Sequence, residues 1–258
     1  MRLTVLLSSS NARLAAARRL TRRSARRETG RFLAEGAQAV REALAADAVV
    51  ELFATGDAID RNAELLDGVD VAEISEKDAA VLSETVTPQG LVAVCALTQP
   101  TLAELLARVP RLLVLLVEPN EPGNLGAIIR TADAAGADAV LLDGGSDPYN
   151  GKAVRASAGS LFHLPVLACP TADVLAVEGL STLATTSHGD VDLDQLIDDG
   201  ALAGRTAWIF GSEAHGLPDD VRGAATHQVR IPIRGRAESL NLAAAAAVCL
   251  YASARAQR

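Results

Sequence analysis

Aromatic residues are scarce in this chain. Its 258 residues include one tryptophan, two tyrosines and four phenylalanines. Proteins that bind single-stranded nucleic acid without sequence preference stack successive bases on a series of aromatic side chains. The composition therefore argues against that mode of binding, and Trp208, which stands in an apolar stretch, is predicted to belong to the core.

Cysteines and long apolar runs are also few. The three cysteines, Cys95, Cys169 and Cys249, are far apart and show no Cys-x-x-Cys or Cys/His spacing, which favours buried free thiols and predicts no metal site. No apolar run approaches the roughly 18 residues that a membrane span needs. The segment Met1–Ser8 is too short an apolar run for a signal peptide. We therefore expect a cytosolic protein with no membrane partner.

The common phosphate-binding motifs are missing as well. No Gly-x-Gly-x-x-Gly follows the first strand of the C-terminal block, and no Gly-x-x-x-x-Gly-Lys-[Ser/Thr] occurs in the chain. These absences disfavour a generic α/β enzyme that acts on nucleotides. The glycine-rich turns lie instead after the late strands, so we expect the ligand-binding end in the C-terminal part.

The sequence that is present divides into two alternating α/β blocks. Residues 1–97 are predicted to form a small α/β domain, with an arginine-rich helical start. Its predicted elements are a strand at 32–36, a helix at 37–45 and strands at 49–54, 69–74 and 91–96. Residues 98–110 contain two prolines around a short helical pattern and are the predicted linker.

The second block, residues 111–258, begins with an apolar run. Leu112–Val117 is apolar on both faces, which is typical of a parallel central strand covered by helices on both sides. Further strands are predicted at 139–142, 164–168, 181–186, 207–210 and 228–231, mostly separated by helical patterns. The block is therefore predicted to be a parallel sheet with helices on both faces.

The charge of the chain is unevenly distributed. A net charge of −8 argues at first against a nucleic-acid partner, but Asn11–Arg31 carries eight arginines against one acid, Glu28. Paired arginines recur every four residues, so one of each pair falls near the same stripe of a helix, where it suits phosphate contacts. A solvated helix face is the alternative. The spacing favours RNA contact by Arg18, Arg19, Arg22, Arg23, Arg26 and Arg27.

Three short motifs combine glycines, which let the backbone approach a ligand, with polar side chains that a core would not choose. The first, Asn124–Arg130, follows the loop after the first central strand, where open α/β sheets place their sites. Asn124 is suited to cap the next helix. Arg130 lies in an otherwise apolar helical stretch, so its guanidinium needs an anion or access to water.

The second motif is Phe210–Leu217. Gly211 and Gly216 can admit a ligand close to the chain, and Ser212 is suited to capping a helix. Capping does not explain Glu213. We do not expect His215 to act as an acid or base.

The third motif is Ile231–Asn241, with Gly235 in the loop. Ser239 is suited to capping the predicted helix Leu242–Ala254, and Arg234 and Arg236 flank the loop. The alanine-rich final helix permits close packing against another helix.

In this order, the three motifs resemble those of the SpoU-type (TrmH) RNA ribose 2′-O-methyltransferases of the SPOUT superfamily. The segments Arg155–Pro165 and Pro88–Ala93 are also similar to that family, so the resemblance covers most of the chain. It implies an α/β fold: a SPOUT parallel-sheet domain with a C-terminal trefoil knot, preceded by a small α/β RNA-binding domain. It also implies S-adenosyl-L-methionine as cofactor and a homodimer.

The resemblance further implies roles for individual residues. The catalytic set is Arg130, Asn124, Glu213, Ser239 and Asn241. The cofactor-binding set is Thr185, Phe210, Gly211, Gly216, Leu217, Ile231, Ile233 and Leu240, and Arg234 and Arg236 join the six N-terminal arginines as RNA-binding residues. Arg130 acts on the ribose 2′-hydroxyl, either as a transiently neutral base or, as we favour, as a charged group that holds phosphate and stabilises the alkoxide.

Residues 1–97 resemble a ribosomal-protein-like substrate-binding domain, which favours structured RNA, and large-subunit ribosomal RNA over transfer RNA. A transfer RNA 2′-O-methyltransferase is one alternative. The other is a noncatalytic RNA-binding ribosome-assembly factor of the same fold. That alternative would predict loss of motif residues such as Arg130 or Glu213, and both are present.

Overall fold

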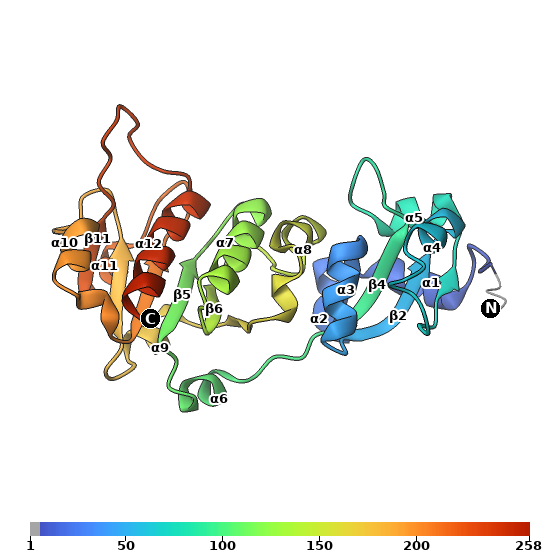
Figure 1. Cartoon of the computed structure of the whole chain (residues 1–258), viewed down its shortest axis with the longest axis horizontal. Coiled ribbons are helices and arrows are strands. Elements are labelled where there is room, and N and C mark those ends of the chain that lie inside the picture. The colour runs from blue at the N-terminus through green and yellow to red at the C-terminus, as the bar shows by residue number, and fades with distance from the viewer. Residues whose placement is uncertain (1–5) are drawn as a thin grey trace. The chain divides into compact units, whose positions relative to one another are not determined.

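The computed structural model describes residues 6–258, which form two compact α/β units (Figure 1). The first unit consists of the chain up to Thr98 together with Asp147–His163. The second consists of Gln99–Ser146 and Leu164–Arg258. In the described part of the chain, no helix is both long and apolar enough to cross a membrane.

Unit 1 is built on a four-stranded sheet with the order β1-β4-β2-β3. Strand β4 is antiparallel to β1 and β2, and β3 is parallel to β2. The strands are β1 (Arg31–Glu35), β2 (Val49–Ala54), β3 (Ala72–Glu73) and β4 (Leu91–Ala96). The helices are α1 (Ala12–Arg19), α2 (Arg23–Thr29), α3 (Ala37–Ala45), α4 (Gly56–Arg61), α5 (Glu76–Leu82), α8 (Gly151–Ser157) and the 3-10 turn η1 (Ser160–Phe162). The predicted strands at 49–54 and 91–96 and the helix at 37–45 are confirmed, whereas the predicted strand at 69–74 shortens to β3.

The arginine-rich start is two short helices, so the prediction of one continuous arginine stripe is wrong. Helix α1 ends at Arg19 and α2 begins at Arg23. Apolar residues of this segment face inward: Leu14 and Leu20 are buried in the core of unit 1.

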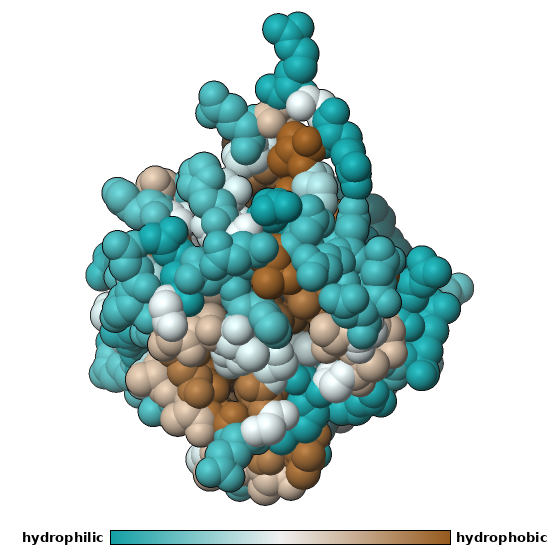
Figure 2. Space-filling view, turned by 90° about the vertical axis from the view of Figure 1, so that its left-hand side faces the viewer, coloured by the Kyte–Doolittle hydropathy of each residue, from teal (hydrophilic) through white to brown (hydrophobic). Residues whose placement is uncertain are grey.

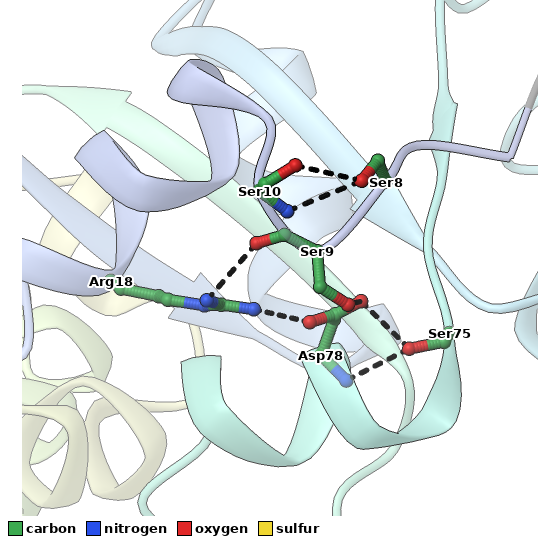
Figure 3. A network of polar contacts seen from close by, with 6 residues as sticks. All are labelled: Ser8, Ser9, Ser10, Arg18, Ser75 and Asp78. Atoms are coloured by element: carbon green, nitrogen blue, oxygen red, sulfur yellow. Dashed lines mark hydrogen bonds and ion pairs between the residues drawn. The ribbon is translucent and has the colours of Figure 1, made fainter.

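Two of the predicted RNA-binding arginines are committed to contacts inside unit 1. Arg18 donates to the carboxylate of Asp78 and to the Ser9 carbonyl, as Figure 3 shows. Burial raises the pKa of Asp78, but hydrogen bonds from Ser75 and Ser9 and the charge of Arg18 outweigh it and lower the pKa overall. Arg26 is only 4% exposed, so its predicted contact with RNA is wrong in this conformation.

The remaining N-terminal arginines point outward. Arg22 and Arg27 are exposed, and Arg19 forms an exposed ion pair with Glu28. Arg23 is exposed as well. The basic surface of this segment is therefore smaller than the sequence suggested.

Unit 2 is a seven-stranded sheet in which every neighbouring pair is parallel, as predicted. Its order is β7-β6-β5-β10-β8-β11-β9. The strands are β5 (Leu112–Val117), β6 (Ala139–Asp143), β7 (Val166–Ala168), β8 (Ser181–Thr185), β9 (Val191–Asp192), β10 (Thr206–Phe210) and β11 (His227–Arg230). The helices are α6 (Leu102–Ala107), α7 (Pro122–Ala134), α9 (Thr171–Leu175), α10 (Leu193–Asp198), α11 (Asp219–Ala224) and α12 (Leu242–Ala256), with the 3-10 turn η2 (Ala201–Ala203).

Helices cover both faces of this sheet, which confirms the prediction. Apolar residues of α6, α9 and α11 pack on one face of β5, β6 and β10. On the other face α12 packs against α7 and β10 (Figure 1). Trp208 of β10 is fully buried and donates to Ser253 Oγ of α12 at 2.9 Å, so it is a core residue, as predicted.

The three cysteines are buried free thiols, as predicted. Burial raises the pKa of Cys95 to about 12 and that of Cys169 to about 11, and it also raises the pKa of Cys249. Thiols with raised pKa values are poor nucleophiles and poor metal ligands at neutral pH.

Candidate active site

A cavity of about 570 Å³ opens at the carboxyl ends of β8, β10 and β11, next to the start of α12. Parallel α/β sheets place ligand sites at this edge, in the crevice outside the strand ends. The cavity is lined by Thr185, Thr186, Ser187, Phe210, Gly211, Ser212, Glu213, Gly216, Val229, Ile231, Ile233, Glu238, Ser239, Leu240, Asn241, Leu242 and Ala245. The second and third sequence motifs thus meet in one place.

Most of the residues predicted to bind the cofactor line this cavity. The exception is Leu217, which is 6% exposed and packs in the core of unit 2. The predicted cofactor-binding set did not include Thr186 and Ser187, which directly follow Thr185 in the chain and also line the cavity. It also missed Val229 and Ala245, which carry no motif signal and come near the cavity only through the tertiary fold.

The loop after β10 doubles back on itself, and two glycines make this possible. Gly216 has a φ of +67°, a left-handed conformation that glycine adopts without strain. A Cβ on Gly211 would lie 2.1 Å from the carbonyl carbon of Gly216. The Gly216 amide donates to the Ser212 carbonyl at 2.9 Å, and Ser212 Oγ accepts from the His215 amide at 3.3 Å. Ser212 therefore supports this turn and does not cap a helix, since α11 begins only at Asp219.

The loop after β8 is held against the neighbouring strands. Thr185 Oγ1 donates to the Ile209 carbonyl at 3.0 Å, and the Thr186 amide donates to the Val229 carbonyl at 2.9 Å. Further along, Arg230 donates to the Gly189 carbonyl at 3.2 Å. These bonds fix one wall of the cavity.

The loop between β11 and α12, residues 231–241, forms another wall and protrudes from the sheet (Figure 1). Ile233 and Leu240 are 37% and 39% exposed, and Figure 2 shows both hydrophobic and hydrophilic surface on this protruding part. Arg234, predicted to bind RNA, donates to Asp194 at 2.6 Å, whereas Arg236 is exposed.

Glu213 links the second motif to the first. Its carboxylate accepts from the backbone amides of Asn120 at 3.0 Å and Glu121 at 3.3 Å, and from Asn124 Nδ2 at 2.9 Å. Burial raises the pKa of Glu213, but these hydrogen bonds, with that of Asn124 foremost, outweigh it and lower the pKa below its ordinary value of 4.5. Glu213 is therefore a carboxylate at neutral pH and acts as a hydrogen-bond acceptor.

Asn124 also joins the third motif. Its Oδ1 accepts from Asn241 Nδ2 at 3.2 Å, and Asn241 caps α12 by accepting from the amides of Ala243 and Ala244. Two capping predictions are therefore wrong: α7 begins at Pro122, so Asn124 lies in its first turn, and Asn241, not Ser239, caps α12. The amides of Asn124 and Asn241 and the carboxylate of Glu213 form one connected polar chain.

Arg130 lies apart from this cavity within one chain. It is exposed on α7, about 9 Å along the helix axis from Asn124 at 1.5 Å per residue. It does not line the cavity. Within residues 6–258 its guanidinium forms no hydrogen bond or ion pair, and is thus available to an anion from outside the chain. The same residues hold no group of three or more His, Cys, Asp or Glu side chains that could bind a metal ion.

Comparisons with known proteins agree with this arrangement. Residues 111–251 match the SpoU rRNA Methylase family, and residues 11–93 match the MRM3-like substrate binding domain. The 23S rRNA (guanosine(2553)-2′-O)-methyltransferase RlmP of Bacillus subtilis is 34% identical over 95% of this chain and 96% of its own length. The 23S rRNA (uridine(2479)-2′-O)-methyltransferase of Streptomyces viridochromogenes is 35% identical over 71% of this chain and 63% of its own length.

Solved structures show the same architecture. The AdoMet-bound rRNA methyltransferase from Sinorhizobium meliloti superposes with a TM-score of 0.82 at 31% identity, covering 97% of both chains. The SpoU methyltransferase AviRb from Streptomyces viridochromogenes, in complex with AdoMet, gives a TM-score of 0.79 at 31% identity, covering 95% of this chain and 97% of that one.

Proposed function

The chain belongs to the SpoU rRNA Methylase family, and we propose that it transfers a methyl group from S-adenosylmethionine to a ribose 2′-hydroxyl of 23S ribosomal RNA. The observation that carries the proposal is the meeting of the second and third motifs at one cavity. The first motif is joined to them by the connected polar chain of Glu213, Asn124 and Asn241. The substrate follows from the relatives, which are named as 23S rRNA 2′-O-methyltransferases.

The cavity fits S-adenosylmethionine. Its volume of about 570 Å³ lies in the usual range for small-molecule sites. Its lining combines apolar surface from Phe210, Ile231 and Leu240 with hydroxyl groups and with the glycine-rich backbone of the loop after β10. When bound, this cofactor supplies an electrophilic methyl group on a sulfonium. The chain's own residues hold the cofactor and orient the acceptor.

Transfer from a bound S-adenosylmethionine would exchange the carbon–sulfur bond for a bond from carbon to the 2′-oxygen and release S-adenosylhomocysteine. The ribose hydroxyl would give up its proton to solvent water. An arginine keeps its proton under ordinary conditions, so Arg130 is better suited to stabilise developing negative charge on the 2′-oxygen, while it also holds an RNA phosphate, than to act as a base. Its exposure and lack of an internal partner support this role. A transiently neutral Arg130 that accepts the proton is the alternative mechanism.

We assign Glu213, Asn124, Ser239 and Asn241 to the organisation of this site. Glu213 is ionised and fully engaged as an acceptor, which suits a group that positions loops. Asn241 orients the start of α12, which lines the cavity.

The proposal includes a homodimer with a composite site. Because Arg130 lies outside the cavity of its own chain, a partner is needed to bring an Arg130 to each cavity. Helix α12 carries an exposed apolar stripe of Ala244, Val248 and Tyr251 at helical spacing, and it packs beside α7. These features suit an interface formed by α7 and α12.

We further propose that residues 111–258 are the catalytic domain, with the family's trefoil knot at the C-terminal end. The insertion of the late strand β10 between β5 and β8 and the return of α12 to α7 support a knotted path. We assign residues 1–97 to RNA binding and 98–110 to a linker. The exposed side chains of Arg22 and Arg27 support the assignment of residues 1–97 to RNA binding. A substrate in ribosomal RNA implies a cytosolic location.

The test is a map of 2′-O-methylation in ribosomal and transfer RNA from cells with and without the gene. We expect loss of methylation at a 23S ribosomal RNA nucleotide and its return on methylation in vitro by the purified protein. Loss at a transfer RNA nucleotide instead would favour a transfer RNA enzyme. Unchanged maps, together with no heat of binding for S-adenosylmethionine or S-adenosylhomocysteine, would favour a noncatalytic RNA-binding factor.

A further inference from the structure

The charged side chains around the cavity of unit 2 are all of one sign. Among the residues that the structure describes, the lining includes two carboxylates, Glu213 and Glu238, and no lysine, arginine or histidine. We propose that Glu238 is a specificity-determining residue, whose carboxylate makes the site prefer the sulfonium of S-adenosylmethionine over the neutral sulfur of S-adenosylhomocysteine. This inference rests on the proposed function, because it takes the cavity to be the cofactor site.

Glu238 differs from Glu213 in that its carboxylate is not engaged within the chain. Glu213 accepts three hydrogen bonds, from the amides of Asn120 and Glu121 and from the side chain of Asn124. The side chain of Glu238 forms no hydrogen bond or ion pair with another residue between positions 6 and 258. Glu238 is exposed and lines the cavity, so its negative charge is available to a ligand there.

The arginines of the same loop lie outside the cavity lining. Arg234 donates to Asp194 at 2.6 Å, and its side chain is 82% exposed. Arg236 is exposed, and neither arginine lines the cavity. Water and salt screen exposed charges strongly, so these two arginines act only weakly on a bound ligand.

Uncharged groups around the cavity change this preference little. The Thr185 hydroxyl donates its proton to the Ile209 carbonyl at 3.0 Å, so toward any further partner its oxygen can only accept. The start of α12 opposes a cation, because a helix N-terminus carries a partial positive charge of about half a unit. Asn241 already accepts from two of the amides there. The full negative charge of Glu238 is the larger effect.

The two ligands differ in the charge that this carboxylate meets. Both carry an ammonium and a carboxylate group, but only S-adenosylmethionine has a positive charge on sulfur. Transfer of the methyl group would leave the electron pair of the carbon–sulfur bond on sulfur, and the positive charge would be lost. The attraction to Glu238 falls with it, so the carboxylate favours the replacement of product by fresh cofactor.

The first test measures the Kd of both ligands by isothermal titration calorimetry at low ionic strength. Glu238→Gln keeps the size of the side chain and removes its charge. Glu178→Gln is the matched control, because it removes the same charge from an exposed glutamate of unit 2 that does not line the cavity. The ratio of the Kd for S-adenosylhomocysteine to the Kd for S-adenosylmethionine should fall about fivefold in Glu238→Gln, the size expected of one partly screened charge pair. We expect no change of this ratio in Glu178→Gln.

This ratio isolates the sulfonium from the rest of the ligand. If Glu238 binds the ammonium group, which both ligands share, its replacement weakens both by the same factor. Equal losses, or no loss for either ligand, would therefore overturn the assignment. Sinefungin carries an amine near the position of the sulfonium and should weaken together with S-adenosylmethionine, and a response like that of S-adenosylhomocysteine would contradict the role of charge.

Salt gives an independent measurement. Because salt screens exposed charge pairs, the ratio in the wild type should fall about threefold between low salt and roughly 0.5 M salt. The ratio in Glu238→Gln should stay constant. A ratio that does not respond to salt in the wild type would overturn the electrostatic explanation.

The same titrations separate this inference from the proposed function. Both ligands are measured on one preparation, so a partly unfolded variant changes the stoichiometry and not the ratio. A wild-type protein that binds neither ligand would refute the proposed function and this inference together. Binding of both ligands with an unaltered ratio in Glu238→Gln would refute the inference alone. If the protein binds both and methylates no RNA, the proposed function alone has failed, and the ratio still decides the role of Glu238.

Discussion

Substitution of Gly211 by alanine tests the cavity most directly. The added Cβ would lie 2.1 Å from the carbonyl carbon and 2.2 Å from the oxygen of Gly216, and 2.4 Å from the amide nitrogen of Leu217. Ordinary van der Waals contact begins near 3.4 Å. All three atoms belong to the backbone, so no side chain can swing away, and the loop after β10 has to move by roughly 1 Å or more.

The magnitude follows from what that movement breaks. Overpacking of this kind costs about 1–3 kcal/mol, and loss of the hydrogen bond from the Gly216 amide to the Ser212 carbonyl adds about 1 kcal/mol. A cost of about 2 kcal/mol on the conformation that binds the cofactor corresponds to a roughly 30-fold increase in Kd. We therefore expect at least about tenfold weaker binding of S-adenosylhomocysteine.

Isothermal titration calorimetry measures this Kd, and thermal unfolding measures Tm. The matched control is Gly223→Ala on α11, where an added Cβ meets nothing within 4 Å and alanine favours a helix more than glycine does. We expect a lower Tm for Gly211→Ala and an equal or higher Tm, with unchanged Kd, for the control. A Gly211→Ala protein with wild-type Kd and Tm would refute the reasoning.

Three further predictions concern the charged residues. Arg130→Ala should abolish methyl transfer. It should leave the cofactor Kd within about twofold, because Arg130 does not line the cavity. A methylation assay and calorimetry measure the two effects, and a fully active variant would contradict the prediction. The lowered pKa of Glu213 means that its carboxylate stabilises the folded chain above its ordinary value of 4.5, and that this contribution is lost as the pH falls through the lowered folded-state pKa. The difference in free energy of unfolding between wild type and Glu213→Gln, measured with urea, should therefore shrink between pH 6 and pH 3, and a constant difference would argue against the hydrogen-bonded carboxylate. Combined replacement of Arg22 and Arg27 by glutamine should weaken RNA binding and reduce the slope of log K against log salt by up to about 2; an unchanged slope in filter binding would show that these side chains do not contact phosphate.

Much of the fold could be predicted from local sequence. Strand β5 is apolar on both faces, a pattern typical of a strand that is covered by helices on both sides. Its bounds and its place inside the sheet could therefore be predicted from the apolar run alone. The glycines of the second motif likewise predicted a tight loop, because few other residues adopt the backbone conformations that such a loop requires. The short strands β3 and β9 carried too few residues for a periodic signal.

Side-chain partners were the weak point of the sequence interpretation. Asn124 and Asn241 were recognised as polar motif residues, but the sequence could not show that α7 begins at Pro122 or that the two amides meet. Arg26 was predicted to contact RNA together with the neighbouring arginines, because charge and spacing alone do not distinguish an exposed arginine from a buried one. Its partner Asp147 is 121 residues away in the chain.

The sequence by itself determined the kinds of element, the polar residues of the site and the resemblance to a family, because these depend on local preference and on residue type. The tertiary structure decided which of those residues meet. It brought Glu213 to the start of α7, left Arg130 outside the cavity of its own chain, and placed Asp147–His163 in unit 1. The physical reason is that hydrogen bonds and ion pairs between distant segments depend on the path of the whole chain, and a local pattern does not contain that path.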